Sequence, residues 1–572
     1  MGDPLIPRVT VIKPTRIGYT KCLMAAMGAT AAIDPCAMIL LVPTDDDARG
    51  FAVDEVEPSF EATPALRGLI KTGRVDGRNT LTMKTIAGGG SIKILSARSP
   101  RNLRRHDAKK LFIDEVDGME VTAEGDPILL AEKRTLAHPD RKIIMGSTPT
   151  DDTSLIAKSY AASDQRIFEV PCPHCGSFFE IVWKLIVWPS GEPRKAVCYC
   201  PHCFEEASRE RKIERDIFTD RPQLIIEESH KREMIEAGTW TAMKPEVTDH
   251  AGFRLNSLIS LHANANWGSL ATEYVKAKRG GLAELQVFAN TVEGRVWTSS
   301  PDKIDTETLA ARVEDFGIRP GQAGQNRFPE EVLLLCAGVD TQDDRFEVLL
   351  WGWSETEEFL LDRHVIDGDP DDGLTQAELD AYLKTTWQHP NGWTIGIEAT
   401  AVDSQGHKTQ AVYDFCRPRL ARRIYPIISR SGPRPHWKRA PKPAKDGTRL
   451  FIVGHDGVKT SFLQHLALPA KDDAGLNNVG YIRFSSDLDA DTFDQLAGER
   501  RTVRYVRNRP IAEFKRTKPG QPVEALDGSC YAWAVRTTLK NINFAERRSR
   551  RGAAAAPRRS LGDLSAILNK GK

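Results

Sequence analysis

The sequence predicts neither a membrane-spanning helix nor a secretory leader. No apolar run reaches the roughly 18 residues that a membrane-spanning helix requires. The N-terminal Met1-Gly2-Asp3-Pro4 is not a basic segment followed by an apolar one. A large excess of charge is also absent, because 79 Lys and Arg balance 78 Asp and Glu to a net charge of +1. We therefore expect an intracellular protein in which any contact with nucleic acid comes from local basic patches.

Cysteine is sparse outside one short segment, which argues against a disulfide framework. Five of the ten cysteines lie between Cys172 and Cys203, and the others occur singly. Disulfide frameworks are typical of small secreted chains, whereas a cysteine cluster in a large intracellular protein indicates metal binding.

Two C-P-H-C motifs in this segment are separated by 24 residues. Four thiolates at this spacing suit tetrahedral Zn²⁺ without an open coordination position, which predicts a structural site. The alternative is a group of buried free thiols. Cys198 is a spare cysteine, and His174 and His202 are competing ligands that we rank below the four predicted ones, Cys172, Cys175, Cys200 and Cys203.

The length of 572 residues predicts about three or four domains. The N-terminal part alternates β-like runs with helical stretches, which predicts a mostly parallel α/β sheet. An Ala-rich helix is expected at Lys21–Ala32. The expected strands are Arg8–Ile12, Met38–Val42, Ser91–Leu95, Lys110–Ile113 and Lys142–Met145.

A second α/β region begins at Val332, after a stretch, Thr298–Glu330, that is poor in apolar residues and that we expect to be a linker. Two apolar runs predict a hairpin around Thr341–Asp344. The Arg-rich tail Ala545–Lys572 is expected to be disordered apart from a short amphipathic helix at Leu561, Leu564, Ile567 and Leu568.

A phosphate-binding turn is predicted where the first strand meets the first helix, in the place of a G-x-x-x-x-G-K-[ST] pattern. Gly18 and Thr20 fit this pattern, whereas Tyr19 takes the lysine position and Lys13 the first glycine position. Lys13 can supply the cation for the phosphates, Thr20 the hydroxyl for Mg²⁺, and Arg16 an arginine finger. The alternative is an ordinary basic turn. The aligned positions are Lys13, Pro14, Thr15, Arg16, Ile17, Gly18, Tyr19 and Thr20.

Two further strands end in residues suited to nucleotide chemistry. Asp114 is expected to hold Mg²⁺ and Glu115 to polarise the attacking water, since the carboxyl end of such a strand lies beside the phosphate-binding turn. A pair of solvated acids is the alternative. The run Gly146-Ser147-Thr148-Pro149 ends the next strand, and its hydroxyls can sense the γ-phosphate.

Three acids in the second half are expected to converge at one end of a sheet. Such a cluster binds two Mg²⁺ or Mn²⁺ ions about 3.5–4 Å apart and cuts phosphodiesters. The three are Asp340, Asp403 and Asp527, with Glu398 and Glu524 as alternative ligands; each acid is otherwise a cap or turn residue.

Basic residues crowd one stretch of this second region. Ten Lys and Arg, and no acid, lie between Asp414 and Asp446. Such a stretch can neutralise DNA phosphates, and its alternative is a solvated surface loop. It includes Arg417, Arg419, Arg422, Arg423, Arg430, Arg434, Lys438 and Arg439, with Trp437 among them.

The order of these motifs resembles the lambda-type (GpA) family of phage terminase large subunits from Lys13 to about Ala534. The passages that carry the resemblance are "KPTRIGYTK", "LFIDEVDGM", "MGSTPT", "CPHCG" with "CPHC", "GFRLNSLISLHANANWGSLATEYVKAK", "FANTVEGRVW", "AGVDTQDDRFEVLLWGW", "VDSQGHKTQAVYDFCR" and "EALDGSCYAWA".

The resemblance implies an α/β protein with a P-loop ASCE-type ATPase domain on a parallel sheet, a four-cysteine zinc-ribbon insertion and an RNase H-like nuclease domain. The implied ranges are 1–165 for the ATPase domain, 166–215 for the insertion, 216–330 for the rest of the motor and a linker, 331–544 for the nuclease and 545–572 for a basic tail. ATP would contact Lys13 to Lys21 and Asp114, and Glu115 with Arg16 would act in hydrolysis.

The same resemblance implies cofactors and partners. The cofactors are ATP with Mg²⁺, Mg²⁺ or Mn²⁺ at the nuclease site and structural Zn²⁺. The partners are double-stranded DNA, a small terminase subunit, the capsid portal and further copies of the chain, in the host cytoplasm and away from membranes. Family members carry a longer segment before the phosphate-binding strand, so we expect weaker nucleotide and small-subunit binding here.

Two other functions remain open on sequence alone. One is a DNA helicase or translocase without nuclease activity, in which the second-half acids are structural. The other is a non-enzymatic zinc-containing DNA-binding protein, which would retain DNA without turning over nucleotide.

Overall fold

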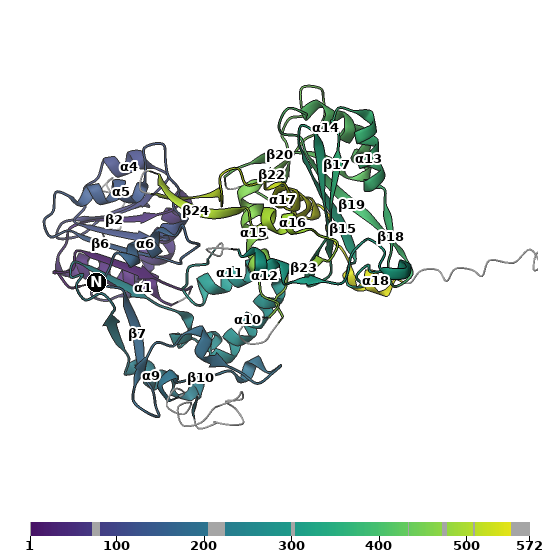
Figure 1. Cartoon of the computed structure of the whole chain (residues 1–572). Coiled ribbons are helices and arrows are strands. Elements are labelled where there is room, and N and C mark those ends of the chain that lie inside the picture. Colours follow the sequence, from purple (N-terminus) through teal and green to yellow (C-terminus); the bar gives the residue numbers. More distant parts are fainter. Residues whose placement is uncertain are drawn as a thin grey trace, which may run out of the picture. The chain divides into compact units, whose positions relative to one another are not determined.

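The computed structural model describes residues 2–15, 17–70, 80–203, 224–298, 304–432, 434–471, 477–506 and 509–550. The chain forms two compact units (Figure 1), one made of Met1–Thr298 with Val503–Ile511 and the other of Ser299–Thr502 with Ala512–Lys572. Within the described ranges, no helix combines the length and apolar character that crossing a bilayer demands.

The first unit contains a 10-stranded sheet in the order β12-β7-β13-β1-β6-β5-β2-β4-β3, with β8 paired to β7. The neighbouring strands from β7 to β4 run parallel, which confirms the predicted sheet. All five expected strands are present. The bounds are β1 (Arg8–Ile12), β2 (Ala37–Val42), β3 (Met83–Thr85), β4 (Ser91–Ser96), β5 (Lys110–Asp114), β6 (Lys142–Ser147), β7 (Arg166–Pro171), β8 (Phe178–Phe179), β12 (Thr239–Ala242) and β13 (His250–Arg254).

Helices cover both faces of this sheet because apolar side chains point alternately to either side of each strand. Leu40 of β2 packs on one face with Leu23 of α1, and Leu41 packs on the other face with Leu103 of α4. The Ala-rich helix is α1 and extends slightly beyond its predicted ends. The helices are α1 (Tyr19–Ile33), α2 (Asp45–Gly50), α3 (Glu57–Ala62), α4 (Pro100–Arg104), α5 (Pro127–Glu132) and α6 (Leu155–Ala161).

The cysteine motifs follow β7 and belong to a separate small core. A three-stranded sheet in the order β11-β10-β9 supports them. Its apolar side chains, such as Ile226, share a cluster with Trp267 and Phe288 from two helices of the first unit. The elements are β9 (Ile186–Val187), β10 (Val197–Tyr199), β11 (Ile225–Ile226), α9 (Lys231–Glu236), α10 (Trp267–Gly280) and α11 (Leu282–Thr291).

The second unit contains another 10-stranded sheet, in the order β14-β23-β17-β16-β15-β19-β20-β22-β21, with β18 paired to β19. β15 and β16 form the predicted hairpin, and β15 runs parallel to β19. The bounds are β14 (Val313–Glu314), β15 (Leu334–Thr341), β16 (Arg345–Trp353), β17 (Glu357–Asp367), β18 (Thr386–Gln388), β19 (Thr394–Asp403), β20 (Ile424–Arg430), β21 (Trp437–Arg439), β22 (Phe451–Gly454) and β23 (Tyr481–Ser485).

Helices lie on both faces of this sheet too. One face packs on α15, α16 and α17, and the other on α13 and α14 (Figure 1). A two-stranded ribbon, β24–β25, precedes α17. The bounds are α13 (Gly373–Leu383), α14 (Thr409–Cys416), α15 (His455–Ala467), α16 (Ala490–Leu496), β24 (Glu499–Val506), β25 (Arg509–Arg516) and α17 (Glu524–Arg536).

Two expected irregular stretches contain regular structure. The expected linker contributes α12 (Thr306–Ala310) and β14, which pairs with β23, because Leu309 and Phe316 are apolar enough to join the core. The expected disordered tail begins instead with a helix, α18 (Phe544–Ser549), capped by the Asn543 side chain. The predicted helix at Leu561–Leu568 lies outside the described residues.

Candidate functional sites

The predicted phosphate-binding turn lies between β1 and α1. The backbone of Gly18 takes the left-handed conformation, with φ of 86°, directly before the helix. Lys13 follows β1 and is 8% exposed. Its Nζ lies 2.6 Å from Glu115 Oε1 and 3.3 Å from Asp114 Oδ1. The fold therefore brings the Lys13 ammonium group into contact with Asp114 and Glu115, which are distant from it in the sequence.

Tyr19, which takes the lysine position of the usual pattern, points into the protein. Its side chain is 5% exposed, and Lys13 Nζ lies 5.3 Å from the centre of its ring. The ring occupies the space beside Gly146 of β6, where a Cβ atom would come within 2.2 Å of Tyr19 Cζ. The Tyr19 side chain thus packs in the core behind the turn. Its buried hydroxyl and ring do not face the predicted phosphate site, so Tyr19 could contact a phosphate there only through its backbone.

The other residues of the turn are placed differently from one another. The backbone N–H and the hydroxyl of Thr15 both donate to the carbonyl of Thr291 in α11, at 2.9 and 3.3 Å. Thr20 is half-buried in the first turn of α1. Lys21 turns to the surface, where its Nζ lies 2.5 Å from Glu55 Oε2. Arg16 lies outside the described residues.

The acids that end β5 show strain and unusual electrostatics. Glu115 adopts a left-handed backbone, with φ of 54° and ψ of 52°, which costs free energy in a residue other than glycine and points to function. Burial raises the pKa of Asp114, although Lys13 opposes this change. Burial also lowers the pKa of Lys13, but Asp114 and Glu115 outweigh it and raise that pKa. This site suits a bound cation.

The third predicted element contacts the same acids. Ser147, at the end of β6, lies with Oγ 3.5 Å from Glu115 Oε2 and accepts a hydrogen bond from the Asp117 backbone N–H at 3.2 Å. Sequence reasoning missed Asp117. Its half-buried carboxylate accepts hydrogen bonds from the N–H groups of Thr150 and Ile156, at 3.1 and 2.9 Å. Asp117 therefore fixes the loop that follows Ser147, and its position two residues after Glu115 was the available signal.

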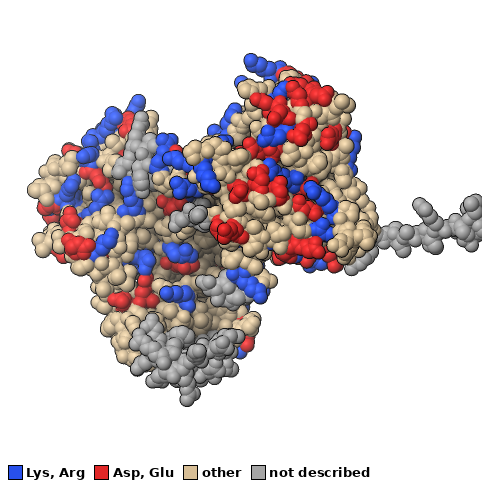
Figure 2. Space-filling view, in the orientation of Figure 1, with Lys and Arg blue, Asp and Glu red and all other residues tan. Residues whose placement is uncertain are grey.

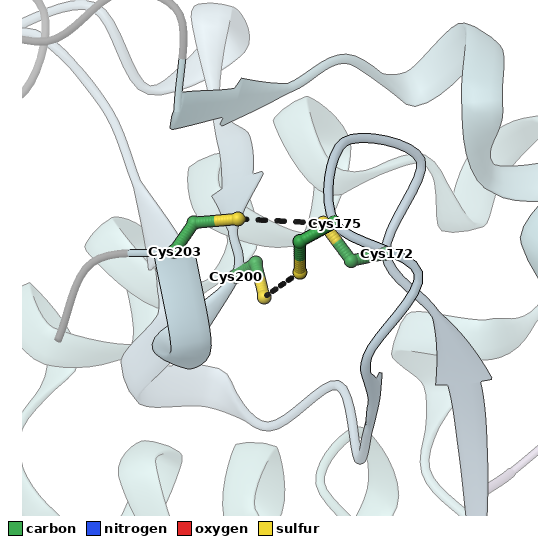
Figure 3. Close-up of side chains that lie close together, drawn as sticks. All are labelled: Cys172, Cys175, Cys200 and Cys203. Carbon is green, nitrogen blue, oxygen red and sulfur yellow. Dashed lines mark hydrogen bonds between the residues drawn. The ribbon is translucent and has the colours of Figure 1, made fainter. Parts of the chain in front are cut away.

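The four predicted cysteines form the one group of possible metal ligands found within the described ranges that is closed, with all ligand atoms within 4.8 Å of one another. Figure 3 shows the two motifs turning their thiols toward each other. The Sγ atoms of Cys172 and Cys203 are 3.8 Å apart, and those of Cys175 and Cys200 are 3.9 Å apart. Four sulfurs about 2.3 Å from a tetrahedral metal lie about 3.8 Å from each other, whereas a disulfide spans about 2.05 Å. The geometry fits a metal.

The lower-ranked ligands are engaged elsewhere. His174 Nε2 lies 3.0 Å from the carbonyl of Ile225, and His202 Nε2 lies 3.2 Å from that of Phe178. Cys198 is buried, which raises the pKa of its thiol and keeps it protonated.

The three predicted nuclease acids come from three elements of the second unit. Asp340 lies near the end of β15, Asp403 ends β19 beside it, and Asp527 lies in the first turn of α17. The helix approaches the strand very closely, since a Cβ atom on Gly338 would lie 1.8 Å from the carbonyl oxygen of Gly528. Glycine at this position therefore brings the helix and its acid against the sheet.

The charges of these acids act on one another. Burial raises the pKa of Asp340 well above its usual value, and the charges of Asp403 and Asp527 raise it further. Burial and Asp527 likewise raise the pKa of Asp403 to about 7, against its hydrogen bonds to backbone N–H groups. Buried carboxylates in mutual repulsion are the donor set that a divalent cation relieves. The residues present therefore fit a metal, although the three do not form a closed cluster like that of the cysteines.

Asp527 differs from its neighbours because Lys459 and His455 face it. Burial raises its pKa, but Lys459 and His455 outweigh burial and lower that pKa to about 2. Lys459 Nζ lies 2.8 Å and His455 Nε2 3.8 Å from Asp527 Oδ1. Sequence reasoning missed both residues. The signal was their four-residue spacing, which places them on one face of α15.

Glu398 and Glu524, the alternative metal ligands, differ in whether their side chains have a partner. Glu398 pairs with Arg547 of α18, whose Nη2 lies 3.0 Å from Glu398 Oε2. This ion pair engages both oxygens of Glu398. Glu524 lies one turn before Asp527 on α17, and its buried Oε2 has no hydrogen-bond partner among the residues that the structure describes.

The basic stretch after Asp414 is partly neutralised. Arg419 and Arg422 donate to Asp380 Oδ1 at 2.8 and 2.5 Å, and Arg417 pairs with Asp446. Within the described ranges no acid pairs with four exposed cations near β20 and β21, namely Arg430, Arg434, Lys438 and Arg439. On the face drawn in Figure 2, basic and acidic side chains are interspersed.

A parallel-sheet unit with a turn suited to phosphate, joined in one chain to a unit with buried acids suited to divalent cations, fits an enzyme that hydrolyses nucleotides and phosphodiesters. The domain family described as "Phage terminase large subunit gpA, ATPase domain" matches residues 1–219. The family described as "Terminase large subunit gpA, endonuclease domain" matches residues 250–548.

Whole proteins are similar along the same length. The terminase large subunit of Escherichia phage lambda is 28% identical over 94% of this chain and 83% of its own. That of Enterobacteria phage P21 is 27% identical over the same shares. The large terminase of bacteriophage HK97 has a TM-score of 0.29 and 9% identity over 92% of this chain and 91% of its own, which adds nothing to the assignment.

The chain therefore belongs to the gpA family of phage terminase large subunits. It is an ATPase and an endonuclease of phage DNA packaging, which confirms the family, fold class and activities that the sequence predicted.

Proposed function

We propose that ATP with Mg²⁺ binds at the turn from Lys13 to Lys21 and that its hydrolysis drives double-stranded DNA into the procapsid. Lys13 neutralises the phosphates, and Thr20 and Asp114 hold Mg²⁺. Glu115 polarises the attacking water, and Arg16 stabilises the developing charge. The observation that supports this proposal is the contact of Lys13 Nζ with both acids, at 2.6 and 3.3 Å.

We further propose that Asp340, Asp403 and Asp527 form the nuclease site that cuts concatemeric DNA. A bound Mg²⁺ or Mn²⁺ supplies an activated water and stabilises charge on the phosphate. Asp340 and Asp403 are buried, with 6% and 8% of each residue exposed, and their carboxylates would hold the metal. The charge of Asp403 raises the pKa of Asp340, which supports the assignment.

Zn²⁺ is the metal that we assign to Cys172, Cys175, Cys200 and Cys203, in a structural role. Sulfur–sulfur distances of 3.8 and 3.9 Å support a closed tetrahedral site. We assign the four exposed cations near β20 and β21, which pair with no acid in the described ranges, to contacts with DNA phosphates. The affinity of such contacts falls as the salt concentration rises.

The family assignment leads us to propose the remaining partners. These are a small terminase subunit, the capsid portal and further copies of the chain, acting in the host cytoplasm. We also propose the domain ranges 1–165 for the ATPase, 166–215 for the zinc-ribbon insertion, 216–330 for the rest of the motor and a linker, 331–544 for the nuclease and 545–572 for the basic tail.

ATP hydrolysis by the purified chain, with and without duplex DNA, tests the motor. We expect DNA-stimulated turnover that Lys13→Ala abolishes. The matched control is Lys109→Ala, which removes a lysine at the opposite end of β5 that pairs with Asp34 and Asp140. Turnover that survives Lys13→Ala would remove Lys13 from the site, and no turnover in any form would leave only the nuclease.

Nicking of plasmid DNA in Mn²⁺ tests the nuclease site. We expect Asp340→Ala to abolish nicking. Asp344→Ala serves as the control because Asp344 lies in the hairpin turn with a side chain that is 77% exposed. Persistence of nicking in Asp340→Ala would refute the assigned nuclease site.

A further inference from the structure

Lys459 is a buried cation at a position where packing of the core does not require a charged side chain. Its side chain is 1% exposed and lies on α15 between the buried residues Val458 and Phe462. Burial of an ammonium group is costly unless it is paired and hydrogen-bonded. Lys459 Nζ makes two such contacts, at 2.8 Å to Asp527 Oδ1 and at 2.7 Å to Glu499 Oε2. The structure thus holds a charge here where an apolar residue would pack.

The contacts at Asp527 fall on one of its two oxygens. His455 lies one helical turn before Lys459, and its Nε2 is also directed at Oδ1, at 3.8 Å. No hydrogen bond to Asp527 Oδ2 is found among the residues that the structure describes. The carboxylate is therefore fixed through Oδ1, while Oδ2 stays open.

We propose that Lys459, anchored by Glu499, is a positioning residue that holds Asp527 by Oδ1 and leaves Oδ2 for the divalent cation. The proposal rests on the nuclease site proposed above. Partners that orient a metal ligand are worth about 10–100-fold in metal affinity. Lys459 acts through Asp527 and contacts neither metal nor DNA.

The competing explanation gives the opposite sign. If Lys459 merely neutralised the acids, it would repel the incoming cation, and its removal would tighten metal binding. If it positions Asp527, its removal frees the carboxylate to rotate, and metal binding weakens even though the site has become more negative.

Binding of Mn²⁺ to the full-length chain, followed by electron paramagnetic resonance without nucleotide, separates the two. In Lys459→Met, which keeps the length and removes the charge, we expect about 10-fold weaker binding or more. Lys459→Arg should recover part of the loss because it keeps a donor for both acids. Unchanged or tighter binding in Lys459→Met would overturn the proposal.

Two further variants keep the outcome interpretable. Glu499→Gln removes the charge of the anchor at a side chain that is 13% exposed, and it carries the test if Lys459→Met fails to fold by circular dichroism. We expect its loss of affinity to lie between wild type and Lys459→Met, and unchanged binding in a folded Glu499→Gln would overturn the anchoring role. Asp340→Asn identifies the site: Mn²⁺ binding unaffected by this change refutes the proposed nuclease site, whereas binding lost there but retained in Lys459→Met refutes the inference alone.

Discussion

The raised pKa of Asp403 predicts that the stability of the nuclease unit falls as pH increases. Its folded-state pKa is about 7, against an ordinary value of 3.8. The folded chain therefore binds this proton more tightly than the unfolded chain does. The resulting contribution to stability is fully present below about pH 4 and is lost as pH rises through about 7.

The size of this contribution follows from the same pKa. About three units at about 1.4 kcal/mol each give about 4 kcal/mol, of which about 2.5 kcal/mol is lost between pH 5 and pH 8. The variant Asp403→Asn carries no such charge, and its side-chain oxygen can still accept from the Gln405 N–H. We expect its melting temperature, relative to wild type, to rise by at least about 5 °C over that pH range.

Scanning calorimetry at pH 5 to 8, with no added Mg²⁺ or Mn²⁺ and without chelator, measures this difference while sparing the cysteine site. Asp372→Asn, at an exposed residue before α13, is the control and should change equally at every pH. Added Mn²⁺ should narrow the gap at pH 8, since the metal compensates the charge. Melting curves of wild type and Asp403→Asn that shift in parallel with pH would refute the reasoning.

Three other outcomes follow from the site geometry. Cys200→Ser should lose the bound metal, measured by elemental analysis, and unfold the middle region, measured by circular dichroism, because such sites supply about 10–16 kcal/mol of folding energy; a folded, metal-loaded variant would contradict this. In Gly146→Ala the new Cβ atom would lie 2.2 Å from Tyr19 Cζ, so the Tyr19 ring must move. We expect ATP hydrolysis to fall at least about 10-fold and the free energy of unfolding to fall by about 1–3 kcal/mol. Glu398→Gln should leave nicking within about twofold of wild type while loosening the ion pair with Arg547, and complete loss of nicking would restore Glu398 as a ligand candidate.

The sequence was sufficient for the sheet of the first unit and for placing the acids at the end of β5 beside the predicted phosphate-binding turn. Parallel strands bring their carboxyl ends to one edge, so strand ends distant in sequence can be placed together. The same logic does not place Tyr19, because spacing along a turn does not say which side of it a side chain takes. The space for its ring depends on Gly146, a residue of another strand.

The sequence could not rank Asp403 and Glu398 as proposed metal ligands, for a different reason. The register of β15 and β19 shifts between Ile397 and Ala399, so Glu398 lies at an irregularity in the ladder. A bulge changes which residues share a face, and the two-residue alternation that sequence analysis uses cannot be followed across it. His455 and Lys459 were missed because a four-residue spacing on a helix is common, and only their contacts with Asp527 distinguish theirs.

The two units solve one electrostatic problem in related ways. Each gathers carboxylates at a sheet edge, where they would repel one another, and each places a buried lysine against them. Lys13 contacts both acids of its site, and in the proposed ATP complex its ammonium group would leave those contacts to bind the phosphates. Lys459 contacts Asp527 and Glu499, and Glu499 is outside the proposed metal ligands, so its contacts can persist when a metal binds. We therefore expect nucleotide to rearrange the acids of the first unit, whereas metal enters a site in the second unit that is already oriented.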